Sequence, residues 1–276
     1  AESKSSTPVN SKKPKVSTPS RKKAPPTVRN TEQSRMEGLV AGLDQKDRKQ
    51  FQKPGGTFKP IEQWSGVRLD EKGNVTNIHW KGIFAHKGEI DLTCVPPLVL
   101  TFDASDNRLS GLIDLTRLPS KLSLLDLSKN KFSGPVNLAK LPKSLETLSL
   151  MDNQLSGPLN LNKLPSRITE LILGGNNFCG KLQVSKWPTC LSTIDLCGNS
   201  FDAISFPKKF PEYMANFTLD YHCGFQVRRE NPSTLHLKNK KRPLFVVQPL
   251  DGICPPFYNP EDFGGMSYDE YYASLD

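Results

Sequence analysis

The sequence has no long hydrophobic run. No stretch approaches the roughly 18 consecutive apolar residues that a membrane-spanning helix requires, and hydrophobic residues make up only 36% of the 276 residues. The chain also does not open with the apolar core of a secretory signal. We therefore expect a protein without a transmembrane segment that works inside the cell, in the mitochondrion or the cytosol, with secretion disfavoured.

Cysteine and histidine are scarce. The chain holds six cysteines and four histidines and no Cys-x-x-Cys pair, so neither a small disulfide-stapled scaffold nor a metal-binding pattern is indicated. The glycine loops of nucleotide-binding proteins, Gly-x-Ser-x-Gly and His-Glu-x-x-His are missing as well. These absences predict a protein that is not an enzyme and that uses no metal, cofactor or small-molecule substrate.

Positive charge is concentrated at one end of the chain. The formal net charge is +9, and residues 1–60 alone hold 14 Lys and Arg against 5 Asp and Glu. The first 35 residues contain no aromatic residue, and such a composition cannot bury enough surface to offset the entropy of ordering. We predict a basic extension over residues 1–60 that contacts RNA phosphates through Lys12, Lys13, Lys15, Arg21, Lys22, Lys23 and Arg29.

One helix is predicted near the end of this extension. Met36, Leu39, Val40 and Leu43 follow the i, i+3, i+4, i+7 spacing of a helix face, which predicts a helix within residues 32–51. Two interpretations are open. The helix packs on the neighbouring domain, or it docks on a partner.

Asparagine recurs every 23 residues through the middle of the chain. Around each one the frame Leu-x-x-Leu-x-Leu-x-x-Asn-x-Leu is kept, with other apolar residues at some of the Leu positions. Such a period indicates stacked coils, because one coil alone cannot bury its apolar face. The x-Leu-x-Leu-x part predicts a short strand with alternating faces. We expect a buried ladder of side chains that pair with backbone groups of adjacent coils, formed by Asn107, Asn130, Asn153, Asn176 and Asn199.

The repeated frame resembles the leucine-rich repeat proteins of plants and protists. The resemblance covers residues 64–206 and implies a right-handed solenoid, with a parallel β-sheet on the concave face and a short extended or 3-10 convex side. Trp64-Ser65-Gly66-Val67 is similar to the N-terminal cap of plant extracellular members, but Glu62 and Leu69 stand where those caps have cysteines. We expect the capped solenoid over residues 61–220, and a C-terminal cap with a basic, then acidic and aromatic tail over residues 221–276.

The outward positions of the predicted strands are small, polar and mildly acidic. These positions lie four and six residues before each ladder Asn. They form either a solvated sheet face or a docking groove for a basic or helical protein segment. We favour the groove because such solenoids commonly bind partners through this face. The predicted docking residues are Asp103, Asp126, Ser149, Glu170, Ile172 and Asp195.

A basic residue also recurs with the repeat, ten positions after each ladder Asn. Stacking should align these residues as a stripe outside the concave face. The stripe either keeps the protein soluble or contacts phosphates without reading bases, since no aromatic residues interleave with it. Its members are Arg117, Lys140, Lys163 and Lys186.

These features predict a binding protein. We expect a structural subunit of a large intracellular ribonucleoprotein, such as a cytosolic or mitochondrial ribosome, with its tail on RNA and its solenoid on protein subunits. One alternative is a scaffold or adaptor in a protein-only assembly, either cytoskeletal or membrane-associated. The other is a cell-surface recognition receptor, which would suit the two N-glycosylation triplets Asn74-Val75-Thr76 and Asn216-Phe217-Thr218.

Overall fold

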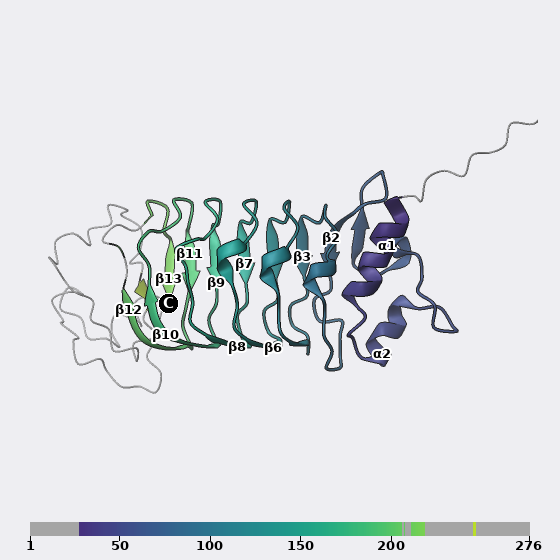
Figure 1. The fold of residues 1–276 in the computed structure, drawn as a ribbon, viewed down its shortest axis with the longest axis horizontal. Coiled ribbons are helices and arrows are strands. Elements are labelled where there is room, and N and C mark those ends of the chain that lie inside the picture. The colour runs from purple at the N-terminus through teal and green to yellow at the C-terminus, as the bar shows by residue number, and fades with distance from the viewer. Residues whose placement is uncertain (1–27, 206, 208–210, 219–244, 247–276) are drawn as a thin grey trace, which may run out of the picture.

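The computed structural model describes residues 28–205, 207, 211–218 and 245–246. Over these residues the chain winds through coils stacked side by side, so that equivalent strands form ladders (Figure 1). Two sheets run along the stack. A main sheet takes the strand that precedes each ladder Asn, and a second sheet takes the strand that follows it.

The main sheet is parallel except at its first pair. Its strand order is β1-β2-β3-β5-β7-β9-β11-β13-β14, and only β1 and β2 run antiparallel. The strands are β1 Val67–Leu69, β2 Val75–His79, β3 Thr101–Asp103, β5 Leu124–Asp126, β7 Thr147–Ser149, β9 Glu170–Ile172, β11 Thr193–Asp195, β13 Asn216–Thr218 and β14 Phe245–Val246. In each three-residue strand from β3 to β11 the middle side chain is buried in the core. The protein is therefore a leucine-rich repeat solenoid, and the predicted fold class is confirmed.

The second sheet was not predicted. Its strands are parallel in the order β12-β10-β8-β6-β4. They are β4 Ser110–Gly111, β6 Lys131–Gly134, β8 Gln154–Gly157, β10 Asn177–Gln183 and β12 Ser200–Ser205. Three of the five end at, or just after, a glycine with positive φ, as at Gly134 (φ 79°) and Gly157 (φ 83°). These three strands, β4, β6 and β8, are too short, and end too soon at glycine, to show the alternation by which a strand is recognised in sequence.

Short 3-10 turns follow the second sheet in three consecutive coils. They are η3 Leu92–Cys94, η4 Leu115–Arg117 and η5 Leu138–Lys140. Each begins after an Asp or Asn whose side chain accepts the N–H two residues on, as Asp114 does from Thr116 at 2.8 Å. This capping fixes the direction in which the chain returns to the main sheet.

The N-terminal end of the solenoid is closed by a helical cap. The cap contains α1 Val28–Leu39, α2 Gln45–Arg48, and the turns η1 Lys49–Phe51 and η2 Ile61–Gln63 (Figure 1). The single helix expected over residues 32–51 is thus divided, and α1 ends at Leu39. Met36, Leu39, Val40 and Leu43 are buried in the same hydrophobic cluster as the repeats, so this segment packs on the solenoid.

Two glycines of the cap allow its helix to approach the first coil closely. A Cβ on Gly38 would lie 2.9 Å from Cys94 Sγ, and one on Gly42 would lie 2.9 Å from the carbonyl oxygen of Glu89. Glycine has a low helix propensity, but at these two positions a larger residue would not fit against the first coil. The buried Glu32 completes the join, because its carboxylate accepts the backbone N–H of Val75 at 3.0 Å.

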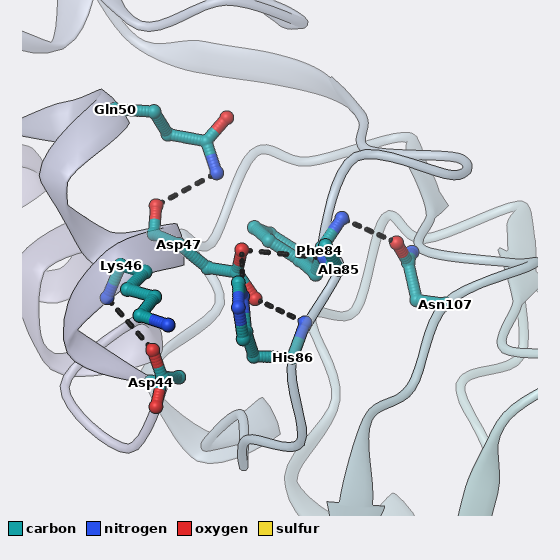
Figure 2. Close-up of polar contacts among 8 residues, drawn as sticks. All are labelled: Asp44, Lys46, Asp47, Gln50, Phe84, Ala85, His86 and Asn107. Atoms are coloured by element: carbon teal, nitrogen blue, oxygen red, sulfur yellow. Dashed lines mark hydrogen bonds and ion pairs between the residues drawn. The ribbon is translucent and has the colours of Figure 1, made fainter.

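A buried carboxylate joins α2 to the segment before the first ladder Asn (Figure 2). Asp47 Oδ2 accepts the N–H of His86 at 2.8 Å, and Oδ1 accepts that of Ala85 at 3.2 Å and lies 3.1 Å from His86 Nδ1. Burial by itself would raise the pKa of Asp47, but the hydrogen bonds from His86 and Ala85 outweigh it and leave this pKa below its ordinary value. The ionised form is therefore the one that holds the cap.

We expect the Asp47→Asn variant to lose about 1.5 kcal/mol of unfolding free energy at neutral pH, as for other hydrogen bonds to a charged group. Because the pKa of Asp47 is lowered by folding, its stabilisation is present above the unfolded-state pKa of about 4 and is lost as pH falls below it. Urea unfolding of both proteins between pH 7 and pH 3 measures this. The two stability curves should converge in acid, and parallel curves would contradict the assignment. Glu71→Gln, an exposed isosteric change, is the control and should have a much smaller effect at every pH.

Candidate protein-binding face

The outer face of the main sheet presents two rows of side chains in register. Across β3, β5, β7, β9 and β11 the Cα partners place Asp103, Asp126, Ser149, Ile172 and Asp195 in one row. The other row contains Thr101, Leu124, Thr147, Glu170 and Thr193. Because successive side chains of a strand point to opposite faces, both rows lie opposite the buried middle residues. We call these ten residues the outer face.

Charge on the outer face has one sign. Four of its ten residues are acidic and none is Lys or Arg. Asp103 and Asp126 are on neighbouring strands at one end, and Glu170 and Asp195 are on neighbouring strands at the other. The strand between the two pairs, β7, presents only Thr147 and Ser149. With strands about 4.8 Å apart, the pairs form two negative ends separated by a neutral centre.

Three of these carboxylates are oriented by their own strands. Asp103 Oδ1 accepts both the N–H and the hydroxyl of Ser105, at 2.9 and 2.7 Å. Asp126 Oδ1 accepts the N–H of Ser128 at 2.9 Å, and Asp195 Oδ1 accepts that of Cys197 at 3.0 Å. The repeated bond holds the carboxylates in one orientation while they remain partly exposed.

The coil of β9 departs from this pattern. Ile172 replaces the aspartate, and Gly174 follows two residues later. The carboxylate of Asp195 lies over Gly174, because a Cβ built there would be 2.9 Å from Oδ2. An aliphatic side chain and a carboxylate thus lie together at this point of the outer face.

The edge of the outer face carries charges that the sequence analysis did not single out. The residue just before each ladder Asn has a positive φ, and in three consecutive coils it is not glycine: Asp106 (φ 57°), Lys129 (φ 53°) and Asp152 (φ 54°). These exposed side chains follow the ends of the main-sheet strands. The 23-residue frame fixes where these charged residues stand, since each directly precedes a ladder Asn, but it does not indicate their positive φ.

Four of the five predicted Asn side chains are buried between coils, and Asn199 is partly buried. Asn130 is typical: its Oδ1 accepts the N–H of Leu109 at 3.0 Å, and its Nδ2 donates to the carbonyl oxygens of Ala104 and Leu127 at 2.9 and 3.1 Å. The same set of bonds recurs at the other four positions. These residues connect coils and do not reach the outer face.

The basic stripe is exposed but lies outside both sheets. Arg117 and Lys140 end η4 and η5, and Lys163 and Lys186 follow in later coils. The first two residues of the stripe lie near the carboxylate of Asp114. A hydrogen bond from Thr116 lowers the pKa of Asp114, and the positive charges of Arg117 and Lys140 lower this pKa further. Part of the stripe is therefore compensated locally.

The remaining predicted site residues cannot be placed on this face. Lys12, Lys13, Lys15, Arg21, Lys22 and Lys23 lie outside the described residues, as does most of the predicted tail over residues 221–276. Arg29 falls within α1. In the part of the chain that the structure describes, no three His, Cys, Asp or Glu side chains gather as metal ligands. Nor does any helix there have the length and hydrophobicity to span a membrane.

Comparison with solved structures finds plant receptor ectodomains. The BIR2 ectodomain from Arabidopsis thaliana is 25% identical over 60% of this chain and 92% of its own, with a TM-score of 0.47. The leucine-rich repeat ectodomain of the receptor kinase SOBIR1 from Arabidopsis thaliana is 23% identical over 66% of this chain and 98% of its own, with a TM-score of 0.48. The Arabidopsis HAESA ectodomain, solved with the IDA peptide hormone, is 20% identical over 70% of this chain and 37% of its own, with a TM-score of 0.45. No protein-family model and no curated protein matches the sequence.

These matches contradict the predicted function and location. They are ectodomains of plant receptors, whereas the sequence analysis predicted a subunit of an intracellular ribonucleoprotein, cytosolic or mitochondrial. That prediction was wrong because it rested on the charge of residues 1–60. A high density of Lys and Arg indicates attraction to negative charge, and it carries no information on whether that charge belongs to RNA or to carboxylates.

Proposed function

We propose that this chain is a non-catalytic recognition domain that binds a basic segment of a protein partner on its outer face. The observation that supports this most directly is the charge of the face: four of its ten residues are acidic, on four of its five strands, and none is Lys or Arg. Parallel solenoids present such a face as one continuous surface. Complementary charge steers a partner to it and sets its orientation.

The arrangement of the face suits an extended or helical segment better than a single residue. Its two acidic pairs are about three strand spacings apart, or about 14 Å from centre to centre. The neutral centre and Ile172 lie between and beside them. A partner segment with basic residues near both ends and a small or aliphatic residue between them would match both the two acidic pairs and the uncharged centre.

The test is neutralisation of the face without loss of its internal hydrogen bonds. The full chain would carry Asp103→Asn, Asp126→Asn, Glu170→Gln and Asp195→Asn together, since an amide oxygen can still accept the strand's N–H. The probe is a fluorescein-labelled 12-residue peptide with Lys at both ends and Ala and Ser between. We expect at least about tenfold weaker binding at low salt, which amounts to a few exposed charge pairs.

The matched control removes four acids from elsewhere on the surface. Asp91→Asn, Asp114→Asn, Glu62→Gln and Glu71→Gln change the net charge equally, and all four residues are exposed. The control should bind the peptide like the wild type. If both variants weaken binding equally, the peptide responds to net charge alone and the outer face is not the site.

We also propose that this recognition takes place outside the cell, in line with the cell-surface alternative. The two N-glycosylation triplets differ in the structure. Asn216 is exposed on β13, whereas Asn74 is 8% exposed and its amide donates to both carboxylate oxygens of Asp70, at 3.1 and 2.8 Å. Only Asn216 has room for a glycan in the folded protein.

When the chain is passed through a eukaryotic secretory pathway behind an added leader, we expect one N-glycan, at Asn216. Endoglycosidase treatment should shift the mobility of the wild type and of Asn74→Gln, but not that of Asn216→Gln. Folded, secreted protein with a glycan at Asn74, or none at Asn216, would contradict this expectation.

A further inference from the structure

The basic end of the chain and the outer face have complementary charge patterns. Residues 1–27 hold seven Lys and Arg and one Glu, and six of the basic residues form two clusters. The clusters are Lys12, Lys13 and Lys15, and Arg21, Lys22 and Lys23, with no charged residue between them. The outer face likewise has two acidic pairs with an uncharged strand between them. Charge alone would therefore draw the two together.

The cap attaches this basic segment at one end of the face. Residue 28 begins α1, which packs on the first coils of the solenoid through Met36 and Leu39. From β3 to β11 the face spans four strand spacings, about 20 Å. A segment of 27 residues reaches up to roughly 90 Å when extended, so both basic clusters can reach every strand of the face.

The attachment also sets the order of the contacts. The cluster at residues 21–23 is nearest to α1 along the chain. Of the five strands of the outer face, the two nearest to the cap are β3 and β5, which carry Asp103 and Asp126. The cluster at residues 12–15 is farther along the chain, and Glu170 and Asp195 are on the strands farther from the cap. A segment running along the solenoid meets the acidic pairs in this sequence without crossing itself.

We propose that the chain's own basic segment, residues 12–23, occupies the outer face within the same molecule and competes with the basic segment of a partner. This inference rests on the proposed function, because it uses the same face. A covalent attachment gives an effective concentration in the millimolar range for a short linker. Exposed charge pairs that are individually weak are then enough to keep the segment on the outer face for much of the time. Access to the face is therefore regulated by the chain itself.

The test removes the positive charge of residues 12–23 in the full chain, so that this segment no longer covers the outer face. Lys12, Lys13, Lys15, Arg21, Lys22 and Lys23 are all changed to Gln, and the probe is a labelled synthetic peptide with the sequence of residues 8–27. We expect the variant to bind the peptide at least about twofold more tightly than the wild type at low salt, because the competing segment no longer reduces the fraction of open faces. The difference should vanish at about 0.5 M salt, where exposed charges are screened.

A matched control removes six positive charges from positions outside the outer face. Arg117, Lys121, Lys140, Lys143, Lys163 and Lys186 are exposed, and their change to Gln should leave the affinity for the peptide near that of the wild type. A gain equal to that of the segment variant would show that net charge alone is responsible and would overturn the proposal. Carbodiimide cross-linking of the wild type at low concentration should join residues 12–23 to the four acidic residues in monomeric protein; cross-links found only in dimers would overturn occupation within one molecule.

Failure of this inference is distinguishable from failure of the proposed function. If the peptide binds neither the wild type nor the segment variant, the outer face does not take basic segments and the proposed function fails. If the peptide binds both with equal affinity, and binding is lost on neutralising Asp103, Asp126, Glu170 and Asp195, the proposed function stands. In that case the chain's own segment does not occupy the face.

Discussion

Replacing Asn153 by alanine is expected to lower the free energy of unfolding by about 3 kcal/mol, the cost of leaving buried backbone groups without partners. Its Oδ1 accepts the N–H of Phe132 at 3.0 Å, and its Nδ2 donates to the carbonyl oxygens of Leu127 and Leu150 at 3.0 and 3.1 Å. The N–H of Phe132 would lose this acceptor completely. The carbonyl of Leu127 would keep the bond that it receives from Asn130 at 3.1 Å.

The control for this effect is an exposed asparagine of the second sheet. Asn177 is exposed on β10, so Asn177→Ala should change stability by less than about 0.5 kcal/mol. Urea unfolding followed by circular dichroism gives both values. Asn153→Asp should be at least as damaging as Asn153→Ala, because a carboxylate keeps the acceptor but loses both donors and buries a charge. If Asn153→Ala matches the surface control, the ladder has no energetic role.

The main sheet could be predicted from the sequence because one rule repeats. A strand with two inward apolar residues, followed by an Asn whose side chain pairs with the backbone, is encoded anew every 23 residues. Five copies in phase make the alternation of each three-residue strand readable, although a single copy would be too short. The same frame predicts the two outward rows, and therefore the residues of the outer face.

The second sheet and the strained positions were beyond the same reasoning. Strand β4 is two residues long, and its pairing depends on the stacking of coils, not on its own side chains. The positive φ of Lys129 is imposed by the turn that brings Asn130 into the ladder. Lysine has no preference for that conformation, so nothing local in the sequence indicates it.

The join between the cap and the solenoid was unpredictable for a different reason. The bond from Val75 N–H to Glu32 spans 43 residues, and that from His86 N–H to Asp47 spans 39. Neither pair is part of the repeat, so no period points to it. Pairs of this kind are decided by tertiary packing, which a pattern in one sequence does not contain.

Loss of one aromatic ring in the cap should have the largest effect on stability. We expect Phe51→Ala to lower the free energy of unfolding by about 3–5 kcal/mol, the range for removing a fully buried aromatic side chain. Phe51 is 0% exposed. Its ring centroid lies 4.5 Å from that of Trp64, 5.3 Å from that of Trp80 and 6.2 Å from that of Phe84, so the cavity would open between the cap and the first coil.

Urea unfolding followed both by tryptophan fluorescence and by circular dichroism tests this. The two transitions should stay coincident and move together to lower urea, because cap and repeats share one hydrophobic cluster. Phe58→Ala is the matched control: Phe58 is only partly buried, with its ring 5.7 Å from Trp64, and should cost much less. A fluorescence transition that moves alone would mean that the cap unfolds separately.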